Sequence, residues 1–491
     1  MGLLKKLAGQ TAVYGISTIG ARLLNYLLVP YLTRVMTDAE YGVVTDIYAF
    51  IPFALVVLTL GMESGYFRFA GQASSEEEKR RTFATAWGAV TLAASLFLGG
   101  MLLFCRPIAA ATGYAAHPAY IGLTAWIVFF DVVTAIPFAR LREQGRARTF
   151  VALKLLNVLI NVPLCVFFYS LLPRLAVGGG FWSTLFDPSF GAGYYLVSNL
   201  VASAVMLPLL LPFTDRVRPR IDRAMAKKLL LYSLPLLVSG IAGTANEFLD
   251  RQMIKYLLPD DIAMGRLGIY GAAVKLSVIM VLFTQMYRYA AEPFFLARFK
   301  KDDFVRTNAE ALKYYWIVSV LIFLGITLFT DLFALILGRD FREGVYLLPV
   351  MLGACILSGV VLNLSFWYKQ SGQTKFAIWV TGSGLVVTIV FNLLLVPRIG
   401  IAGAAWARLL CEGVMVVVSY ALNRKYCPTP YDLPRMAEYL LLGAVLYGLS
   451  FATQLCSPVL HYALNALLVG VFLLYAIQRE RMWTMFRIKI G

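Results

Sequence analysis

The sequence is dominated by fourteen apolar runs, and each run is about long enough to cross a lipid bilayer. A helix needs roughly 20 apolar residues to span about 30 Å of hydrocarbon. The pattern therefore predicts an all-α polytopic membrane protein with fourteen transmembrane helices. The predicted spans are residues 9–32, 44–66, 82–104, 119–139, 150–172, 190–212, 229–254, 267–290, 314–336, 345–367, 376–396, 401–422, 436–453 and 458–477.

The loops between these runs alternate between rich and poor in lysine and arginine. Short loops that carry many of these residues stay on the cytoplasmic side of a membrane. The loops around Arg146, Arg220 and Lys425 are basic, whereas the loop around Asp38 and the segment around Ser183 carry few basic residues. This alternation predicts that both termini are cytoplasmic.

The net charge of +17 follows from the same bias. In a soluble protein such a charge would raise the question of nucleic acid. Here the lysines and arginines are interpreted as topology signals and as contacts for anionic lipid head groups. The expected partners are therefore membrane lipids, and no nucleic-acid partner is predicted.

The chain has the appearance of an internal duplication. Tyr41-Gly42-Val43-Val44 resembles Leu267-Gly268-Ile269-Tyr270, and each stretch follows an acidic loop. A repeat of six helices would relate its halves by an axis along the membrane normal, and chance similarity between apolar helices is the alternative. The expected domains are an N-lobe at 1–213, a basic linker at 214–228, a C-lobe at 229–425, and an added helix pair with a basic tail at 426–491.

The sequence offers little material for catalysis. Its two histidines, His117 and His461, are both predicted in outer loops. There is no phosphate-binding Gly-rich loop ending in Lys-Ser or Lys-Thr, no His-Glu-x-x-His helix and no Gly-x-Ser-x-Gly turn. The six cysteines lack metal or redox spacing and are interpreted as packing residues. We expect neither an enzyme, nor a metal site, nor a cofactor.

Charged and strongly polar side chains inside the spans are the candidate functional residues, because a mid-bilayer charge costs a few kcal/mol unless it faces a polar interior. Arg22 and Lys275 lack an acidic residue three or four positions away and lie too deep to reach the head groups easily. The remaining candidates are Glu63, Asp131, Lys154, Asn157, Asn161, Asn246, Glu247, Asp250, Arg251, Tyr270 and Gln285.

Structural roles are the alternative for each of these charges. Glu247 and Arg251 are four residues apart on one helix face and have the spacing of an ion pair. Arg408 and Glu412 have the same spacing. Arg22 or Lys275 would be structural if it paired with Glu247, Asp250 or Asp131 across helices. Arg68, Arg140 and Arg288 are interpreted as extending to the cytoplasmic head groups.

Several motifs follow one another in order along the chain. They include Val29-Pro30-Tyr31-Leu32-Thr33-Arg34, followed by Asp38-Ala39-Glu40-Tyr41-Gly42. Others are Tyr232-Ser233-Leu234-Pro235 and Gly271-Ala272-Ala273-Val274-Lys275-Leu276. The most specific is the stretch from Asn392 to Ala407, NLLLVPRIGIAGAAWA. Together these motifs resemble those of bacterial oligosaccharide flippases of the polysaccharide biosynthesis group, within the MATE-like flippase superfamily.

The resemblance implies two six-helix lobes that form a V, with two further helices at the C-terminus. It also implies that helices 1, 2, 7 and 8 line a central cavity and that the protein lies in a bacterial cytoplasmic membrane. The implied function is flipping of a polyprenyl-pyrophosphate-linked oligosaccharide to the outer leaflet for surface polysaccharides such as lipopolysaccharide O-antigen. Other glycan-assembly membrane proteins are possible partners.

The chemistry of this substrate agrees with the residues. A pyrophosphate needs cations, for which Arg22, Lys275 and Arg251 are the candidates. Sugars need hydrogen-bonding groups, for which Asn157, Asn161, Asn246, Tyr270 and Gln285 are the candidates. Glu63, Asp131, Lys154, Glu247 and Asp250 are the remaining polar or coupling residues.

Three alternatives stay open. The C-terminal helix pair also resembles lipid II flippases. Glu247 and Asp250 keep a drug or ion antiporter possible, although the first span has no carboxylate. A membrane glycan polymerase or ligase is the third. The sequence does not identify the glycan, the coupling ion or the oligomeric state.

Overall fold

A computed structural model describes residues 26, 28–298, 303–371, 373, 375–455 and 457–480. Helices dominate these residues, and twelve of the helices are long and apolar enough to cross a membrane. A bent pair raises the number to thirteen when it is taken as one span. The predicted span at 9–32 lies mostly outside the described residues, so the total of fourteen stays a prediction.

The described chain divides into two compact units, Met1–Gly271 and Ala272–Gly491. The boundary falls inside helix α13 rather than in the loop at 214–228. Contact density alone does not identify repeats, so the lobes expected from the duplication stay a prediction.

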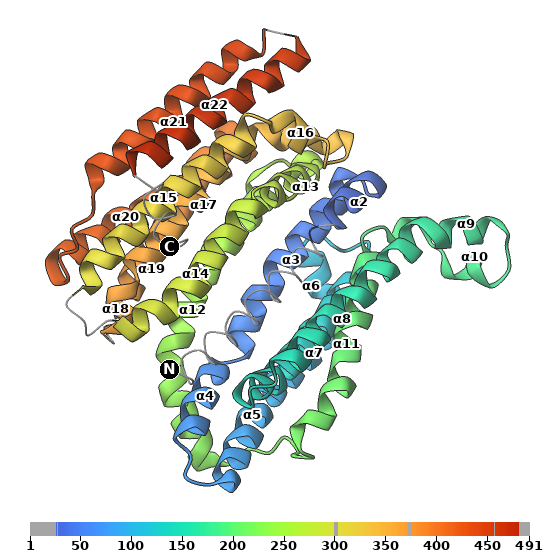
Figure 1. Cartoon of the computed structure of the whole chain (residues 1–491). Helices are drawn as coiled ribbons and strands as arrows, with labels where there is room; N and C mark the ends of the chain where they lie inside the picture. Colours follow the sequence, from blue (N-terminus) through green and yellow to red (C-terminus); the bar gives the residue numbers. More distant parts are fainter. Residues whose placement is uncertain are drawn as a thin grey trace. The chain divides into compact units, whose positions relative to one another are not determined.

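In the first unit, α3, α5, α7, α8, α11 and α12 are the long helices (Figure 1). The helix α7 contacts α3, α5, α8 and α11, and α12 contacts α3, α4 and α5. The elements are α2 (Leu28–Val35), α3 (Asp38–Leu58), α4 (Met62–Gln72), α5 (Glu76–Leu103), α6 (Cys105–Ala111), α7 (Ala119–Glu143), α8 (Ala147–Val166), the π-helical turn Phe167–Leu171, α9 (Leu172–Val177), α10 (Phe181–Leu185), the 3-10 turn Pro188–Phe190, α11 (Gly193–Leu210), the 3-10 turn Leu211–Thr214, α12 (Arg223–Leu257) and most of α13 (Asp260–Leu276).

The second unit contains α14 (Val278–Arg298), α15 (Phe304–Thr327), α16 (Thr330–Ala334), the 3-10 segment Arg339–Leu347, α17 (Leu348–Leu364), α18 (Phe366–Gln370), α19 (Lys375–Ile399), α20 (Ile401–Tyr426), α21 (Leu433–Thr453) and α22 (Pro458–Arg479). The final pair packs on α15, where Val320 and Leu324 meet Tyr439 of α21 and Phe472 of α22 in one apolar cluster.

The structure corrects three predicted elements. The span at 267–290 is broken at Ser277 into α13 and α14, which meet at 50°. The span at 314–336 ends earlier, because α15 stops at Thr327. His461 does not lie in a loop but in the first turn of α22, where Thr453 and Asn465 are its hydrogen-bond partners.

The span at 44–66 is divided by a turn between α3 and α4. Gly61 has a φ of +65°, which glycine adopts without steric cost, and a Cβ there would lie 3.0 Å from the carbonyl oxygen of Ser233. Leu60 also has a positive φ of 54°. This turn brings Glu63 to the start of α4.

Local capping explains where α3 and α5 begin. Thr37 and Glu40 form a capping box at α3: the Glu40 amide donates to the Thr37 hydroxyl, and the Thr37 amide donates to the Glu40 carboxylate. At α5 the Ser75 hydroxyl accepts from the Glu78 amide. The acidic run 76–78 lies where the helix dipole favours negative charge.

The basic segment between α11 and α12 is attached to α5. The Arg220 amide donates to the carbonyl of Ala84 over 3.1 Å. At this crossing α5 presents Gly88, where a Cβ would lie only 2.9 Å from the Arg220 nitrogen. The two backbones therefore meet at a distance that a side chain at position 88 would prevent.

Asp222 adds a second attachment and starts α12. Its carboxylate accepts from the Met225 amide over 2.9 Å and pairs with Arg81 of α5 at 2.5 Å. The Met225 amide, followed by Arg81, holds the pKa of Asp222 below its usual value. The segment is thus fixed to the first unit immediately before the long helix α12 begins.

Arg140 gives the third attachment. Instead of extending to head groups, it is only 6% exposed, pairs with Asp215 at 2.5 Å and lies 4.3 Å over the Phe83 ring. Arg68 lies 4.3 Å over the Tyr232 ring.

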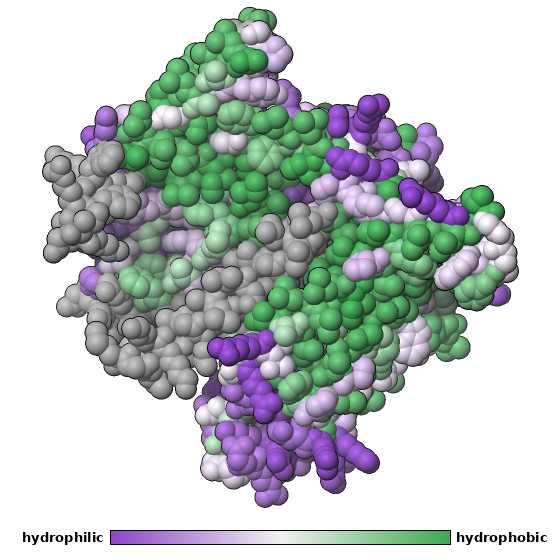
Figure 2. Space-filling view, turned by 45° about the vertical axis from the view of Figure 1, so that its right-hand side comes forward, coloured by the Kyte–Doolittle hydropathy of each residue, from purple (hydrophilic) through white to green (hydrophobic). Residues whose placement is uncertain are grey.

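The molecular surface is strongly apolar. Large side chains such as Leu96, Trp379 and Val417 are 66–70% exposed. In a soluble protein extended apolar patches would signal an interface or an aggregation risk, whereas lipid favours them. Figure 2 shows wide apolar surfaces, with hydrophilic residues gathered in patches such as those at the bottom and the upper right of the view.

Candidate functional site

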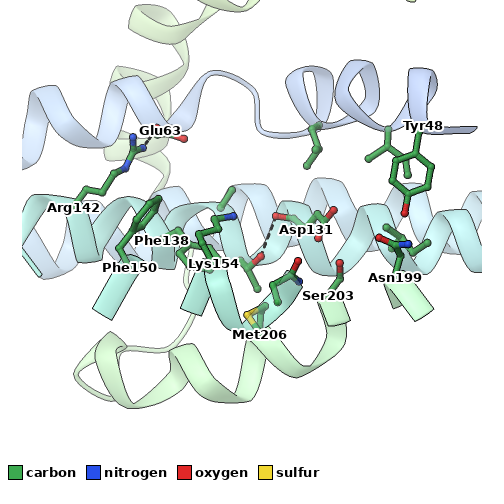
Figure 3. Close-up of a pocket in the computed structure, with 16 residues that line it drawn as sticks. Tyr48, Glu63, Asp131, Phe138, Arg142, Phe150, Lys154, Asn199, Ser203 and Met206 are labelled. Carbon is green, nitrogen blue, oxygen red and sulfur yellow. Dashed lines mark hydrogen bonds and ion pairs between the residues drawn. The ribbon is translucent and has the colours of Figure 1, made fainter. Parts of the chain in front are cut away.

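A polar cavity lies inside the apolar first unit. It has a volume of about 420 Å³ and is lined by residues from α3, α4, α7, α8 and α11. Cavities of this size suit small ligands or parts of larger ones. Its hydrogen-bonding groups come from Tyr48, Asp131, Lys154, Asn157, Asn199 and Ser203 (Figure 3).

Asp131 and Lys154 place opposite charges in this cavity. They come from α7 and α8, and both side chains point into the same space (Figure 3). The Lys154 ammonium also lies 4.1 Å over the ring of Phe138. A charge within a membrane helix is tolerated where it faces a polar or hydrated interior. Two opposite charges on one cavity therefore indicate a hydrated interior rather than lipid contact.

A second charge pair lies toward the α4 end of the same cavity. Arg142 of α7 donates to the carboxylate of Glu63 from α4 (Figure 3). The Arg142 guanidinium also lies 5.0 Å over the ring of Phe67. With these residues the four charged groups on the cavity are two acidic and two basic. The cavity walls are thus polar and balanced in charge.

The sequence predicted four of these lining residues and missed others. Glu63, Asp131, Lys154 and Asn157 line one cavity, and a role in transport stays a prediction for all four. Asn161, on the same helix, is not among its lining residues; it is buried and accepts from the Cys165 thiol at 3.5 Å.

Five further polar lining residues, Tyr48, Thr134, Arg142, Asn199 and Ser203, were not predicted. Asn199 and Ser203 lie four positions apart on α11, so a polar stripe along an otherwise apolar helix was the available signal.

A separate polar group lies where α12 meets α13. The Asp250 carboxylate accepts from the Tyr270 hydroxyl at 2.7 Å and pairs with Arg251 at 3.2 Å. Arg251 also donates to the backbone carbonyl of Glu247. The ion pair inferred from the spacing of Glu247 and Arg251 is therefore corrected: the acidic partner of Arg251 is Asp250.

The remaining predicted site residues lie in several parts of the chain. Arg22 lies outside the described residues. Lys275 is exposed near the end of α13, and Asn246 lies on α12. In the second unit, the side-chain oxygen of Gln285 is buried and has no hydrogen-bond partner among the described residues.

A buried polar group that the sequence did not suggest connects α3 with α12. Asp46 and Lys255 are 5% and 9% exposed and pair at 2.5 Å, although they are 209 positions apart.

Comparison with known proteins places these observations in a family. Residues 7–297 match the family described as "Polysaccharide biosynthesis protein". A curated relative, "Probable low-salt glycan biosynthesis flippase Agl15" of Haloferax volcanii, is 22% identical over 300 residues. That alignment covers 60% of this chain and 62% of the relative, which is under two thirds of the relative's length.

Solved structures show the fold. The lipid II flippase MurJ in an inward closed conformation matches with a TM-score of 0.74 and 13% identity, over 96% of this chain and 100% of that one. An outward-facing multidrug resistance MATE transporter of the MOP superfamily matches with a TM-score of 0.57 and 17% identity, over 86% and 94%. These proteins are described as flippases or transporters, in agreement with the expectation that the chain is not an enzyme.

Proposed function

Because the chain belongs to the polysaccharide biosynthesis protein family, we propose that it flips a polyprenyl-pyrophosphate-linked oligosaccharide from the inner to the outer leaflet of a bacterial cytoplasmic membrane. The resemblance drawn from its motifs is confirmed by the family match and the fold. The substrate, the direction and the membrane are our proposal.

The observation that carries this proposal is the polar cavity among α3, α4, α7, α8 and α11. A sugar chain carries many hydroxyl groups. Removing each hydroxyl from water costs free energy unless a hydrogen-bonding group of the protein replaces the lost water. Asn157, Asn199 and Ser203 offer such groups, and the rings of Tyr48 and Phe150 offer faces for the apolar sides of sugar rings. The cavity thus supplies, within the membrane, hydrogen-bonding groups in place of the water that a glycan loses.

The charge balance of the cavity also supports a saccharide over a hydrophobic cation. An extruder of organic cations is expected to offer an excess of carboxylates, whereas Glu63 and Asp131 are matched here by Arg142 and Lys154. For the pyrophosphate, Lys275 and Arg251 are the described candidates. Arg251 also pairs with Asp250. The polyprenyl chain would remain in lipid.

The proposed direction rests on the basic loops. The segment around Arg220 and the start of α5 would face the cytoplasm, so both termini would be cytoplasmic. The ends of α3 at Asp38 and of α12 at Leu257 would then face outward. Anionic lipid head groups would bind the basic side, and other glycan-assembly proteins would supply and remove the substrate.

A lipid II-type flippase is the second candidate. It is favoured by the fold similarity over nearly the whole chain and by the helix pair α21 and α22 after the first twelve predicted spans. The two candidates differ in the glycan that the cavity receives, and they predict different accumulated carriers when the protein is lost.

The test is a depletion strain complemented with the parent gene or with Asp131→Asn. On depletion we expect a lipid-linked oligosaccharide to accumulate with its glycan facing the cytoplasm, and the parent gene but not the variant to restore surface glycan. Accumulation of lipid II instead would favour the second candidate. Cleavage or elongation of a labelled carrier by the purified protein would contradict both.

A further inference from the structure

One carboxylate in the first unit accepts hydrogen bonds from three donors that belong to other segments. Asp46 of α3 is bonded by the Tyr114 hydroxyl, by the Gln252 side-chain amide and by the Lys255 ammonium. Tyr114 precedes α7, whereas Gln252 and Lys255 lie on α12. We call these four residues the Asp46 cluster.

The Asp46 cluster contains a buried ion pair, and both carboxylate oxygens of Asp46 accept hydrogen bonds. The Lys255 ammonium lies 2.5 Å from the Asp46 carboxylate and 4.3 Å over the Tyr114 ring. Removing one charge from such a pair leaves the other unpaired, whereas removing both together is far less costly. The cluster therefore fastens α12 to α3 through polar bonds.

Glycines fasten the same end of α3 to α13. A Cβ on Gly268 would lie 2.0 Å from the carbonyl oxygen of Asp38, and one on Gly42 would lie 2.0 Å from that of Met264. The two helix backbones are thus in direct contact, as small residues allow in membrane proteins. At this end α3 is held by both α12 and α13.

A second cavity reaches the Asp46 cluster from the same end. It has a volume of about 660 Å³, and Lys255 and Tyr114 are part of its wall together with Glu40, His117 and Tyr256. The polar bonds of the cluster therefore lie beside a space that can hold water. In the proposed orientation this cavity faces outward.

We infer that the Asp46 cluster holds the outer side of the transporter closed, and that Asp46 and Lys255 must separate for the glycan to leave. This inference rests on the proposed function. Both residues act as positioning residues: they fix α3 against α12 and do not contact the substrate. The neighbouring cavity supplies water that can solvate the two charges when they part.

The first test measures whether a reagent in water can reach the contact between α3 and α12 on the inner side of the cluster. Phe53 of α3 stacks on Phe248 of α12 with centroids 5.4 Å apart, about two turns further along α3 than Asp46. In a cysteine-free background we replace Phe53 by cysteine and apply a membrane-impermeant thiol reagent from outside. The double variant Asp46→Asn with Lys255→Met removes both charges and strands neither.

We expect the double variant to raise the labelling rate at position 53 by about tenfold, the effect of losing one charged hydrogen bond from a two-state equilibrium. The matched control neutralises another ion pair of this unit, Asp215 and Arg140, of which only Arg140 is buried, and should leave that rate unchanged. Parent-like labelling in the Asp46 and Lys255 double variant, with protein abundance preserved, would show a purely structural pair and overturn the inference.

The second test cross-links α3 to α13, which together with α12 holds this end of α3. A Cβ on Gly271 would lie 3.0 Å from the Cβ of Thr45, slightly closer than in a disulfide. The variant Thr45→Cys with Gly271→Cys should lose glycan export under oxidation and regain it on reduction, whereas each single cysteine should respond to neither.

Export that continues after complete cross-linking would contradict the inference. The labelling test does not depend on the substrate. If position 53 opens as expected while no lipid-linked glycan accumulates on depletion, the proposed function fails and the gate stands.

Discussion

Glu480, at the end of α22, pairs with Lys313 of α15 at 2.6 Å and accepts a hydrogen bond from the Tyr439 hydroxyl of α21 at 3.1 Å. The Glu480 side chain is only 5% exposed. One carboxylate thus joins three helices of the second unit. At the other end of the same helix pair, the Asn465 amide donates to the carbonyl of Leu328, so the pair is attached to α15 at both ends.

This arrangement predicts a large effect for a small change. Glu480→Gln leaves Lys313 without its carboxylate, which we expect to cost up to about 3–5 kcal/mol of stability. The control is Glu438→Gln, whose pair with Arg479 is more exposed and should contribute much less to stability. Thermal unfolding of both variants in one detergent measures the difference, and equal melting temperatures would contradict the assignment.

Gly88 and Gly99 on α5 make a matched pair for the crossing of the basic segment. Gly88→Ala places a methyl group against the Arg220 backbone and should destabilise by about 1–3 kcal/mol. At Gly99 nothing lies within 4 Å, so Gly99→Ala should be neutral or stabilise the helix by up to about 1 kcal/mol. The same unfolding measurement decides, and a neutral Gly88→Ala would show that the crossing adapts.

The cavity predicts a loss of transport with protein abundance preserved. Lys154→Met and Asp131→Asn each remove one charge from a polar cavity, and we expect export to fall by at least about tenfold, as for loss of a charged hydrogen bond. Asn161→Ala, on the same helix but outside the cavity lining, should not reduce export per molecule. Abundance is measured by immunoblot beside surface glycan, and a collapse of abundance in the charge variants would assign the two residues to folding.

The orientation predicts which loops a reagent reaches. Cysteines placed near Arg146, Arg220 and Lys425 should be shielded from an impermeant thiol reagent in intact cells, while cysteines near Asp38, Ser183 and Gly338 should react. The native cysteines are removed first. Reaction of the arginine-rich loops from outside would reverse the proposed direction. The Asp46 cluster would then lie on the cytoplasmic side.

The sequence predicted the spans well because each one is a local property of the chain. The span at 119–139 became α7 with the same first residue, and that at 401–422 became most of α20. The break at Ser277 was not predicted, since no proline or glycine marks it. The pairing of Asp46 with Lys255 joins residues from distant helices, and spacing along one chain cannot reveal such a contact.

The candidate site followed the same division. Asp131 and Lys154 were predictable because a charge in an apolar run is conspicuous by itself. Asn199 and Ser203 became candidates only when packing placed α11 beside α7 and α8. The i,i+4 spacing suggested Glu247 as the ion-pair partner of Arg251, whereas in the structure the carboxylate that pairs with Arg251 is that of Asp250.

The attachment of the basic segment to α5 has a mechanical consequence for α12. Arg223, the first residue of α12, directly follows Asp222, which pairs with Arg81 of α5. Pro235 lies about three turns later and cannot donate to the carbonyl of Leu231. The first three turns of α12 are thus fixed at their start. A bend in α12 is expected to begin at Pro235 rather than in the segment before the helix.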